Sequence, residues 1–514
     1  MTVFDKRRSL LAFWCGCAVV TGGVLLHLPM YLMGTSNHYQ LAGMPMDSGM
    51  LWGMAAIIFG IALTAYGLLP RKIPATLRVY EQLEPPENAP LTVRHWGVAA
   101  LLALALIIDI MKPASLGFVT PGMRAEYAVG ADVVAWLPLA ALTGAVLGSF
   151  LWGALADWYG RRAAILLSSV MFIGTSICGA MPGLWWNVGM CLLMGAAAGG
   201  MLPVAYALLA EIMPTRHRGW SLVLIGGIGT VGGFFAASSL SALLQPEYSW
   251  RVMWFLNLPT GLLLILMSPL LPESVRFLQQ MGRGAEARAM LARFGIAAAP
   301  ASHAVSAPIP LSSAKPFFGV TWALTLVALA WGLINFGVLL WLPSTLVSEG
   351  QSVASASKLI AASTLIAAPT ILLATWLYAA WSTKGALLVM IGVTAVGLLG
   401  LGLRHSGIGP FANPIVDIAL LIVGSSGVIS ILMPYATENY PLRIRGRATG
   451  WVAGCSKLGG LIAQGLSVLG AVPPLAVAAA TISLPVLIAL LLVARFGRET
   501  RGHDLRELDL AVVN

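Results

Sequence analysis

The sequence predicts an all-α membrane protein of fourteen spans, with two six-helix repeats preceded by an additional two-helix hairpin at the N-terminus. Three observations predict this fold class. Of the 514 residues, 58% are hydrophobic and only 10% are charged, whereas soluble domains carry roughly 25% charged residues. The chain divides into fourteen apolar runs, each close to the roughly 20 residues that cross a bilayer as a helix. The pattern E-x-x-P-x-R-x-R-G also occurs twice, at 211–219 and at 438–446.

The predicted hairpin occupies residues 1–70 and contains the first two apolar runs, at about 10–33 and 49–69. The first run follows the basic segment DKRR, as the apolar region of a signal peptide would. It is too long for such a region and has no clear small-x-small cleavage site, so we expect a retained membrane anchor. A predicted cytoplasmic linker, 71–95, follows and contains the polar segment EQLEPPENAP.

Twelve further apolar runs make up the predicted core, in an N-terminal half at 96–274 and a C-terminal half at 318–495. The repeated nine-residue pattern follows the fourth core run and the tenth. The glycine pairs Gly232–Gly233 and Gly459–Gly460 stand at the same offset from the two copies. We therefore interpret the halves as a parallel repeat, an arrangement typical of secondary transporters. The core runs begin near residues 96, 133, 162, 186, 220, 251, 318, 357, 385, 413, 449 and 473.

Two cytoplasmic segments complete the predicted organisation, a central loop at 275–317 and a tail at 496–514. The central loop begins with a short amphipathic basic helix at about 277–294, which we expect along the membrane surface. An Ala/Pro/Ser-rich tether at 297–316 follows it. The segments PESVRFL, after the sixth core run, and GRETRG, after the twelfth, are another related pair.

The distribution of Lys and Arg predicts the orientation of the chain. With the N-terminus inside the cell and fourteen spans, most of the 30 basic residues fall in inner loops, as the positive-inside rule requires. Both termini are then cytoplasmic, and we expect a multi-pass protein of the cytoplasmic (inner) cell membrane. The basic residues form short clusters between apolar runs, without the patches interleaved with aromatic residues that bind nucleic acid, so we expect no nucleic-acid partner.

The segment GALADWYGRR, at 153–162, resembles the signature loop of the major facilitator superfamily, G-x-x-x-D-x-x-G-R-R/K. The resemblance covers about residues 96–505, and the matching loop of the second half, WSTKGA, is degenerate. It implies an inner-gate charge network, and the alternative is that the same residues only stabilise their loops. The expected members are Gly153, Asp157, Gly160, Arg161 and Arg162 of this loop, with Glu211, Arg218, Glu438 and Arg445 of the repeated pattern.

Ionisable residues inside apolar runs predict functional positions, because they are costly in a bilayer. Asp109 and Lys112 lie three residues apart in the first core run, hence on one helical face. Pro113 cannot donate to the carbonyl of Asp109, so we expect a local break there. Lys457 lies in the eleventh core run. Asp109 and Lys112 are either a structural ion pair or part of the transport site. In the second case Lys112 and Lys457 hold an anionic substrate and Asp109 carries a proton.

Two further segments resemble particular branches of this superfamily. DIMKPASLGFVTPGM, at 109–123, resembles the first span of the bacterial aromatic-acid/proton symporters and the organic-ion transporters, although the aromatic-acid branch has a second aspartate where this sequence has Lys112. CSKLGGLIAQ, at 455–464, resembles the eleventh span of the organic-ion branch, in which a basic residue at the Lys457 position accompanies anionic substrates. The resemblance implies a small organic anion, a carboxylate or aromatic acid, moved with protons by alternating access.

The seventh core run argues against a sugar as the substrate. It reads LVALAWGLINFGVLLWLP and lacks the glutamine pair of the sugar family. Trp331 and Asn335 of this run are expected to line the substrate path.

Two other functions are kept as alternatives. The connection within the hairpin contains His38, Met44 and Met46, whose side chains suit Cu(I), so efflux of copper or of drugs is one alternative. Because methionine is abundant in the chain and packs adaptably, we prefer a packing role and expect no metal site. A non-transporting membrane sensor or assembly protein is the other alternative. The sequence has no GxSxG, HExxH or Walker motif, so we expect no enzyme and no cofactor.

Overall fold

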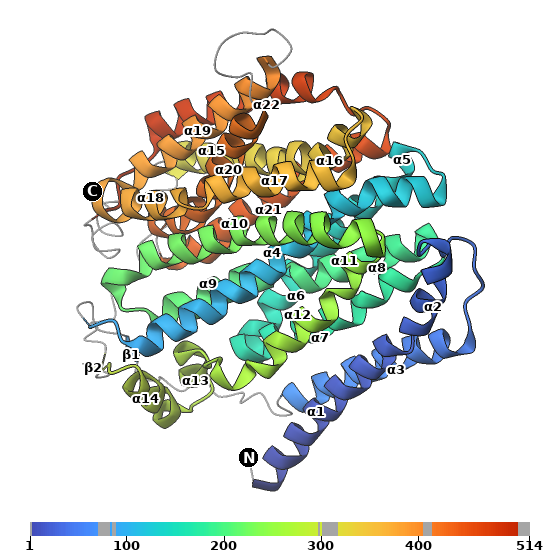
Figure 1. The fold of residues 1–514 in the computed structure, drawn as a ribbon. Coiled ribbons are helices and arrows are strands. Elements are labelled where there is room, and N and C mark those ends of the chain that lie inside the picture. Colours follow the sequence, from blue (N-terminus) through green and yellow to red (C-terminus); the bar gives the residue numbers. More distant parts are fainter. Residues whose placement is uncertain are drawn as a thin grey trace. The chain divides into compact units, whose positions relative to one another are not determined.

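The structure is a computed structural model that describes residues 3–69, 83–84, 89–296, 299–300, 317–403, 414–440 and 442–501. It is almost entirely helical, as Figure 1 shows. Two strands of two residues each, β1 (Leu83–Glu84) and β2 (Ala299–Pro300), pair in antiparallel fashion. The chain divides into two compact units. Unit 1 comprises Met1–Thr215 and Leu240–Ala301, and unit 2 comprises Arg216–Ser239 and Ser302–Asn514.

Unit 1 contains the hairpin and most of the first half. Its helices are α1 (Val3–Leu25), α2 (Leu28–Met33), α3 (Ser48–Leu68), α4 (Val93–Tyr127), α5 (Ala131–Val134), α6 (Trp136–Tyr159), α7 (Arg161–Gly174), α8 (Leu184–Ala198), α9 (Met201–Ile212), α11 (Val252–Phe255), α12 (Asn257–Leu266), α13 (Val275–Gln280) and α14 (Gly284–Arg293). Short 3-10 turns lie at Gly34–Asn37, Thr175–Ala180 and Ser268–Leu270. The long helix α10 (Thr215–Tyr248) is shared between the two units.

Unit 2 contains the first part of α10 and the second half of the chain. Its helices are α15 (Phe318–Leu333), α16 (Leu339–Ser348), α17 (Val353–Ala367), α18 (Thr370–Trp376), α19 (Thr383–Leu403), α20 (Pro414–Asn439), α21 (Leu442–Val468) and α22 (Leu475–Phe496). Two π-helical turns, η6 (Ile334–Val338) and η7 (Leu377–Trp381), interrupt the regular helix after α15 and after α18.

Twelve helical segments of the described residues are long and apolar enough to cross a membrane, against the fourteen predicted. Both hairpin runs are among them, as Arg7–Asn37 and Ser48–Leu68. The sixth core run forms only a shorter apolar segment, Val252–Leu266. The eleventh forms α21, which has 27 residues but is diluted in apolar character by Lys457, Gln464 and several glycines. The composition therefore supports an integral multi-pass membrane protein, with two predicted spans weaker than the rest.

Glycines allow the hairpin helices α1 and α3 to pack closely along their length (Figure 1). A Cβ atom on Gly23 would lie 2.7 Å from the carbonyl oxygen of Gly53, and one on Gly60 would lie 2.8 Å from the backbone nitrogen of Val20. The pair packs on α7 and α12 through a buried apolar cluster. Its members are Phe13, Cys17, Val20, Val24, Met30, Leu41, Met50 and Ile57 of the hairpin region with Leu166, Val170, Ile173, Ile177, Ala180, Met181 and Ile265.

A buried ion pair fixes the connection of the hairpin to the C-terminal end of α4. Arg251 Nη2 lies 2.6 Å from Glu126 Oε1, and both side chains are almost fully buried, at 0% and 5% exposure. Glu126 Oε1 also accepts backbone N–H groups of Leu41 and Ala42, and Oε2 accepts the indole N–H of Trp250. We call these five residues the Glu126 cluster. They tie the loop after α2 to α4 and to the segment before α11.

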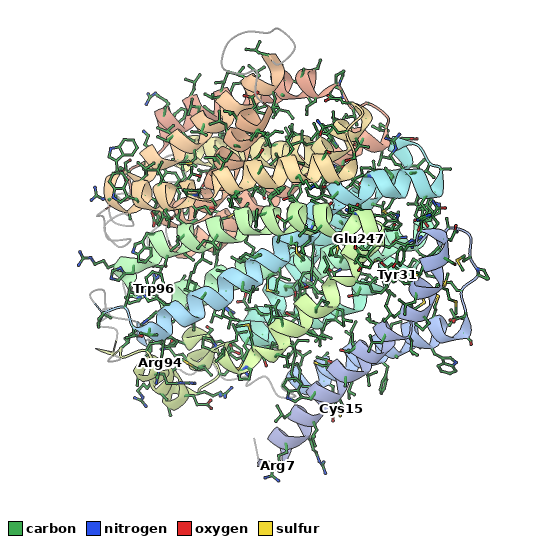
Figure 2. The ribbon with its side chains drawn as sticks, viewed as in Figure 1. Arg7, Cys15, Tyr31, Arg94, Trp96 and Glu247 are labelled. Carbon is green, nitrogen blue, oxygen red and sulfur yellow. The ribbon has the colours of Figure 1, made fainter. Side chains whose placement is uncertain are left out.

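Aromatic residues add a second connection at the same end. The hydroxyl of Tyr31 donates to the carbonyl of Tyr248 at 2.8 Å, and the Tyr31 ring stacks on Tyr39. Figure 2 shows Tyr31 on α2 near Glu247, while Arg7 and Cys15 lie along α1. The hairpin is therefore held to the rest of unit 1 both along its length and at its connecting loop.

The segment after the sixth core run forms two short helices where the sequence predicted one helix at about 277–294. Gly282, with φ of +70°, separates α13 from α14. Ala287 and Leu291 of α14 are buried. The guanidinium of Arg94, which is labelled in Figure 2 at the start of α4, donates to the carbonyl of Arg293. The predicted tether, 297–316, lies outside the described residues apart from β2. Of the predicted linker, 71–95, the structure describes β1 and residues 89–95.

Candidate functional site

Asp109 and Lys112 lie on α4 in the interior of unit 1, with 6% and 2% of their surfaces exposed. The Lys112 Nζ lies 3.0 Å from the ring centroid of Phe172 on α7. It has no hydrogen-bond partner among the described residues, and Asp109 acts on it electrostatically. The structure therefore brings these two predicted residues together and adds Phe172, which sequence reasoning missed.

The predicted break at Pro113 is wrong, because α4 continues as a helix from Val93 to Tyr127 through both Pro113 and Pro121. A proline removes only one helical hydrogen bond, and neighbouring helices and hydroxyl groups compensate in a membrane. Here Ser115 donates to the carbonyl of Met111 and Thr120 to that of Leu116, so the turns around Pro113 and Pro121 keep additional polar contacts.

Lys457 is half-buried on α21 in unit 2. Three residues further on, α21 closely approaches the π-helix η6, because a Cβ atom on Gly460 would lie 2.7 Å from the Phe336 ring. The side-chain amide of Gln464 donates to the carbonyl of Phe336. The glycine pair at 459–460 thus places the turn that carries Lys457 beside α15 and the π-helix η6.

Trp331 and Asn335 are the two predicted path residues on this neighbouring segment. Trp331 is buried, and its indole N–H donates to the carbonyl of Ser425 at 2.9 Å. Asn335 lies within the π-helix η6 and is half-buried. Its Oδ1 has no hydrogen-bond partner in the described part of the chain. Because π-helical turns are frequent at functional sites, Asn335 is the better candidate for a polar ligand contact, whereas Trp331 is engaged in packing.

The predicted gate residues of the first copy meet at the start of α7. Arg161 Nη1 lies 2.8 Å from Asp157 Oδ1, and Arg161 Nη2 lies 3.6 Å from Glu211 Oε1. Gly160 has φ of +104°, a conformation that favours glycine, and a Cβ atom there would meet the Glu273 carboxylate. Gly153 differs, because a Cβ atom on it would meet nothing within 4 Å.

Glu273 is a member of this group that the sequence analysis did not assign. Its Oε1 accepts the backbone N–H groups of Arg161 at 2.9 Å and Arg162 at 3.3 Å, at the N-terminus of α7. Burial raises the pKa of the Glu273 carboxyl, and the backbone hydrogen bonds oppose this rise. Ser274 donates to Glu211 and so joins the two carboxylates.

The second copy of the pattern belongs to a matching group in unit 2. Glu438 Oε2 accepts the hydroxyl of Tyr378 at 2.7 Å and the hydroxyl of Thr500 at 2.6 Å. Glu499 Oε1 accepts the backbone N–H and the hydroxyl of Thr383, at the N-terminus of α19, and its Oε2 accepts the hydroxyl of Ser382. Burial opposes ionisation of Glu499, but these hydroxyl and backbone donors outweigh it and lower its pKa to about 2.

Glu273 and Glu499 therefore occupy equivalent positions, each at the N-terminus of a helix that follows a predicted gate loop. The signal was present in the related segments PESVRFL and GRETRG, but the sequence did not show what the carboxylates contact. Arg218 is half-buried at the start of α10. The side chain of Arg445, predicted to be part of the same gate, lies outside the described residues.

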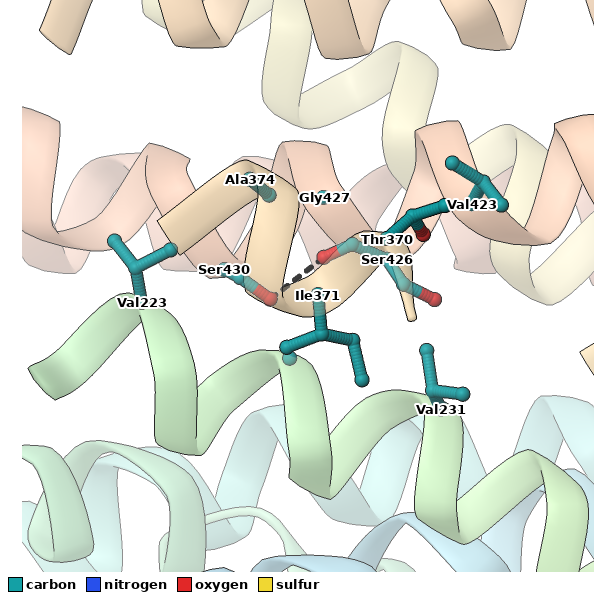
Figure 3. Close-up of a pocket in the computed structure, with 10 residues that line it drawn as sticks. Val223, Val231, Thr370, Ile371, Ala374, Val423, Ser426, Gly427 and Ser430 are labelled. Atoms are coloured by element: carbon teal, nitrogen blue, oxygen red, sulfur yellow. Dashed lines mark hydrogen bonds between the residues drawn. The ribbon is translucent and has the colours of Figure 1, made fainter. Parts of the chain in front are cut away.

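The first part of α10 packs within unit 2. A Cβ atom on Gly219 would lie 3.0 Å from Glu438 Oε1 and 3.2 Å from the Tyr378 ring. Further along the helix, α10, α18 and α20 enclose a small apolar pocket (Figure 3). Its polar groups include the hydroxyl of Ser430, which donates to the Ser426 carbonyl at 2.6 Å. The lining residues are Val223, Gly227, Val231, Thr370, Ile371, Ala374, Val423, Ser426, Gly427 and Ser430.

The residues of the alternative metal site are engaged in local structure. Met44 and Met46 pack against the hairpin cluster as partly buried side chains. His38 is exposed and has φ of +48° at the end of a 3-10 turn. Within the described ranges, no group of three or more His, Cys, Asp or Glu side chains could hold a metal ion.

Comparison with known proteins agrees with this fold. The chain is 24% identical to the niacin transporter NiaP of Acinetobacter baylyi, over 73% of this chain and 87% of the relative. It is 26% identical to a gallate transporter of Pseudomonas putida, over 79% and 90%, and 27% identical to the 4-hydroxybenzoate transporter PcaK of the same species, over 74% and 88%.

Solved structures and a family profile also match the chain, and they show its fold and its family. The proton:xylose symporter XylE, bound to a bromodeoxyglucose, has a TM-score of 0.67 at 16% identity and covers 82% of this chain and 99% of its own. At that identity the likeness shows the fold alone. The Major Facilitator Superfamily profile matches residues 101–464, and the chain therefore belongs to the major facilitator superfamily.

Proposed function

We propose that the protein is a secondary active transporter that moves a small organic anion together with protons by alternating access. The substrate class is a carboxylate such as an aromatic acid. The observation that carries the proposal is that relatives matching 73%, 79% and 74% of the chain are transporters of niacin, gallate and 4-hydroxybenzoate. Each of these compounds is an aromatic carboxylic acid.

Lys457 and Asn335 are the proposed substrate contacts in unit 2. They come from adjoining elements, α21 and the π-helix η6, which meet at Gly460 and Phe336. The ammonium of Lys457 pairs with the substrate carboxylate, because charge-assisted hydrogen bonds are the strong ones. The Asn335 side chain offers both a donor and an acceptor to polar groups of the ring.

Asp109 is the proposed proton carrier. Lys112 and Trp331 were also expected at the substrate, but their described contacts are with Phe172 and with the Ser425 carbonyl. We therefore propose that Lys112 acts together with Asp109 and that Trp331 supports the wall behind the substrate path. Since an ion gradient drives the cycle, the protein performs no covalent chemistry.

We further propose fourteen spans with both termini cytoplasmic, in the inner membrane. The two weaker spans are the α11–α12 segment and α21. A helix of 27 residues is about 40 Å long, which exceeds the roughly 30 Å of the hydrocarbon core. Lys457 can then face a polar path while the rest of α21 contacts lipid and protein.

The groups around Arg161 and around Glu438 are proposed to be the two halves of the inner gate. Each combines a carboxylate from the repeated pattern with a second carboxylate at a helix N-terminus, Glu273 in unit 1 and Glu499 in unit 2. Because each group lies within one unit, it keeps its own half of the gate in shape while the two halves move against each other.

A ligand screen by thermal shift, followed by uptake into proteoliposomes, tests the proposal. We expect nicotinate, benzoate or hydroxybenzoate to raise the melting temperature, because binding to the native state stabilises it, and an inward proton gradient to drive their accumulation. Stabilisation by copper or lipophilic cations and by no acid would favour efflux. Absence of counterflow under any gradient would favour a sensor or assembly protein.

A further inference from the structure

The position of Phe172 beside Lys112 has a specific geometry. The Nζ lies 3.0 Å from the ring centroid, so the amine contacts the face of the ring. Phe172 has 0% of its surface exposed and Lys112 has 2%. The two residues come from different helices of unit 1, α7 and α4, and α4 also carries Asp109 one turn earlier.

The face of an aromatic ring carries negative potential and attracts a desolvated cation. This attraction is important for Lys112, because its Nζ has no hydrogen-bond partner in the described ranges. Two groups therefore act on the amine, the Phe172 ring and the Asp109 carboxylate. Only the carboxylate changes its charge when it gains or loses a proton.

We propose that Phe172 is a positioning residue for proton coupling, which acts by holding the Lys112 ammonium beside Asp109. The inference rests on the proposed function, because it assumes that Asp109 carries the transported proton. When Asp109 is ionised, its carboxylate compensates the ammonium. When a proton binds Asp109 Oδ, the pair loses that compensation and the ring face is the remaining favourable contact. Phe172 thus holds the amine in place in the loaded form, in which the carboxylate no longer does so.

This arrangement separates coupling from substrate binding. Lys112 contacts α7 within unit 1, whereas the proposed anion contacts Lys457 and Asn335 belong to unit 2. Weakening the ring face should therefore impair the proton-dependent step without weakening the substrate contacts. Exchange of internal for external substrate does not require the proton to be released, so it should survive.

The test compares proton-driven accumulation, counterflow exchange and substrate-induced thermal shift in variants at residue 172. We expect Phe172→Leu to lower accumulation roughly tenfold, the size expected when a desolvated cation–π contact is lost, and to leave exchange and thermal shift unchanged. Phe172→Tyr keeps the ring face and should restore accumulation. Stepwise fluorination of the ring weakens its face with little change of shape, so accumulation should fall with each fluorine.

A matched control is Phe118→Leu on α4. Phe118 is buried at 2% exposure, and no cation lies over its ring in the described part of the chain, so this variant should keep accumulation at the wild-type level. Equal accumulation across the fluorinated series would overturn the proposal. This comparison does not depend on Phe172→Leu, whose smaller side chain also changes the packing. Loss of the substrate-induced shift in Phe172→Leu would also overturn it, because Lys112 would then belong to substrate binding.

Failure of the underlying function would appear differently. In that case the wild-type protein itself would neither be stabilised by organic acids nor accumulate them. Failure of the present inference appears only in the comparison of the variants with a functional wild type.

Discussion

The two carboxylates at the helix starts differ in their surroundings although their positions match. Glu273 is half-buried and receives mainly backbone N–H groups, and burial raises its pKa. Glu499 is exposed and receives hydroxyl groups of Ser382 and Thr383 as well, which together lower its pKa to about 2 despite partial burial. In the proposed gate, the Glu499 carboxylate of unit 2 therefore stays ionised to a lower pH than the Glu273 carboxylate of unit 1.

Glu499→Gln should lower the melting temperature of the purified protein at neutral pH, and the difference from wild type should shrink as the pH falls. The folded-state pKa is about 2, below the ordinary value of 4.5. The ionised carboxylate thus stabilises the fold above the ordinary value, and this contribution is lost as the pH falls towards the folded value. For Glu273 the sign is opposite. Burial raises its pKa, so the ionised carboxylate is less favourable in the fold than in the unfolded chain, and the melting temperature of Glu273→Gln should rise relative to wild type as the pH rises. A difference for Glu499→Gln that is independent of pH would contradict the prediction.

Lys457→Ala should abolish uptake of the organic acid while leaving the protein folded in the membrane, because it removes the cation that pairs with the carboxylate. Uptake into proteoliposomes measures the effect, and the melting temperature without ligand is the control for folding. Lys457→Arg keeps a cation and should retain part of the activity. Uptake by Lys457→Ala at the wild-type rate would remove the proposed substrate contact.

At the residue scale, the sequence predicted the charged residues of the candidate site, but it did not predict the uncharged side chains that contact them. The pairing of Asp109 with Lys112 followed from helical spacing, and Arg161 with Asp157 followed from the signature loop. Phe172 could not be predicted, because one phenylalanine among 16 carries no local signal. Only the packing of α7 against the lysine shows its contact.

Among the elements, the N-terminal hairpin is the part of the chain with the least precedent in the family profile, which starts at residue 101. It is nevertheless tightly integrated into unit 1. Glycines bring α1 against α3, an apolar cluster joins them to α7 and α12, and the Glu126 cluster fixes the connecting loop. We therefore expect the hairpin to fold and unfold together with the first half, and not as a separate membrane anchor.

Arg251→Met should destabilise the protein strongly, by about 3–5 kcal/mol, because it leaves the buried Glu126 carboxylate without its charge partner. Arg283→Met is the matched control. It breaks the pair with Glu286, whose side chains are 45% and 55% exposed, and exposed pairs contribute about 0–1 kcal/mol. Unfolding in mixed detergent micelles measures both variants. Equal losses would mean that the Glu126 cluster does not stabilise the fold.

The elements were largely predictable from apolar periodicity, with two informative exceptions. The sequence predicted a full span for the sixth core run. Trp250 and Arg251 instead donate to Glu126, and the apolar helix that follows them is shorter. The helix break at Pro113 was expected from the missing N–H group, yet packing in a long buried helix carries α4 through it. Both differences arise where tertiary contacts override a local rule, and only the predicted break at Pro113 is wrong.

For the whole molecule, α10 is the element shared by the two compact units. Its first part, Arg216–Ser239, packs on α18 and α20 of unit 2. Its last part, from Leu240, belongs to unit 1, which also contains the hairpin. Alternating access moves one half against the other. We therefore expect the contacts of the first part of α10 in unit 2 to open during every transport cycle.

A disulfide between Gly227→Cys and Ile371→Cys should stop transport. A Cβ atom on Gly227 would lie 3.5 Å from the Cβ atom of Ile371, within the range of about 3.5–4.5 Å found in disulfides. Uptake should fall to background on oxidation and return on reduction, and each single variant should be insensitive to oxidant. Full uptake by the oxidised pair would show that α10 and α18 stay together throughout the cycle.

The contact between Tyr31 and Tyr248 also has a consequence for the order in which the chain assembles. The hairpin is synthesised well before its partner, because the Tyr31 hydroxyl bonds to a carbonyl 217 residues later in the chain. At about 5–20 residues per second, the ribosome needs roughly 10–40 s to supply that partner. Before α7 is synthesised, the close glycine contacts already give α1 and α3 a stable pairing. The hairpin thus enters the bilayer well before the last of its partners is available.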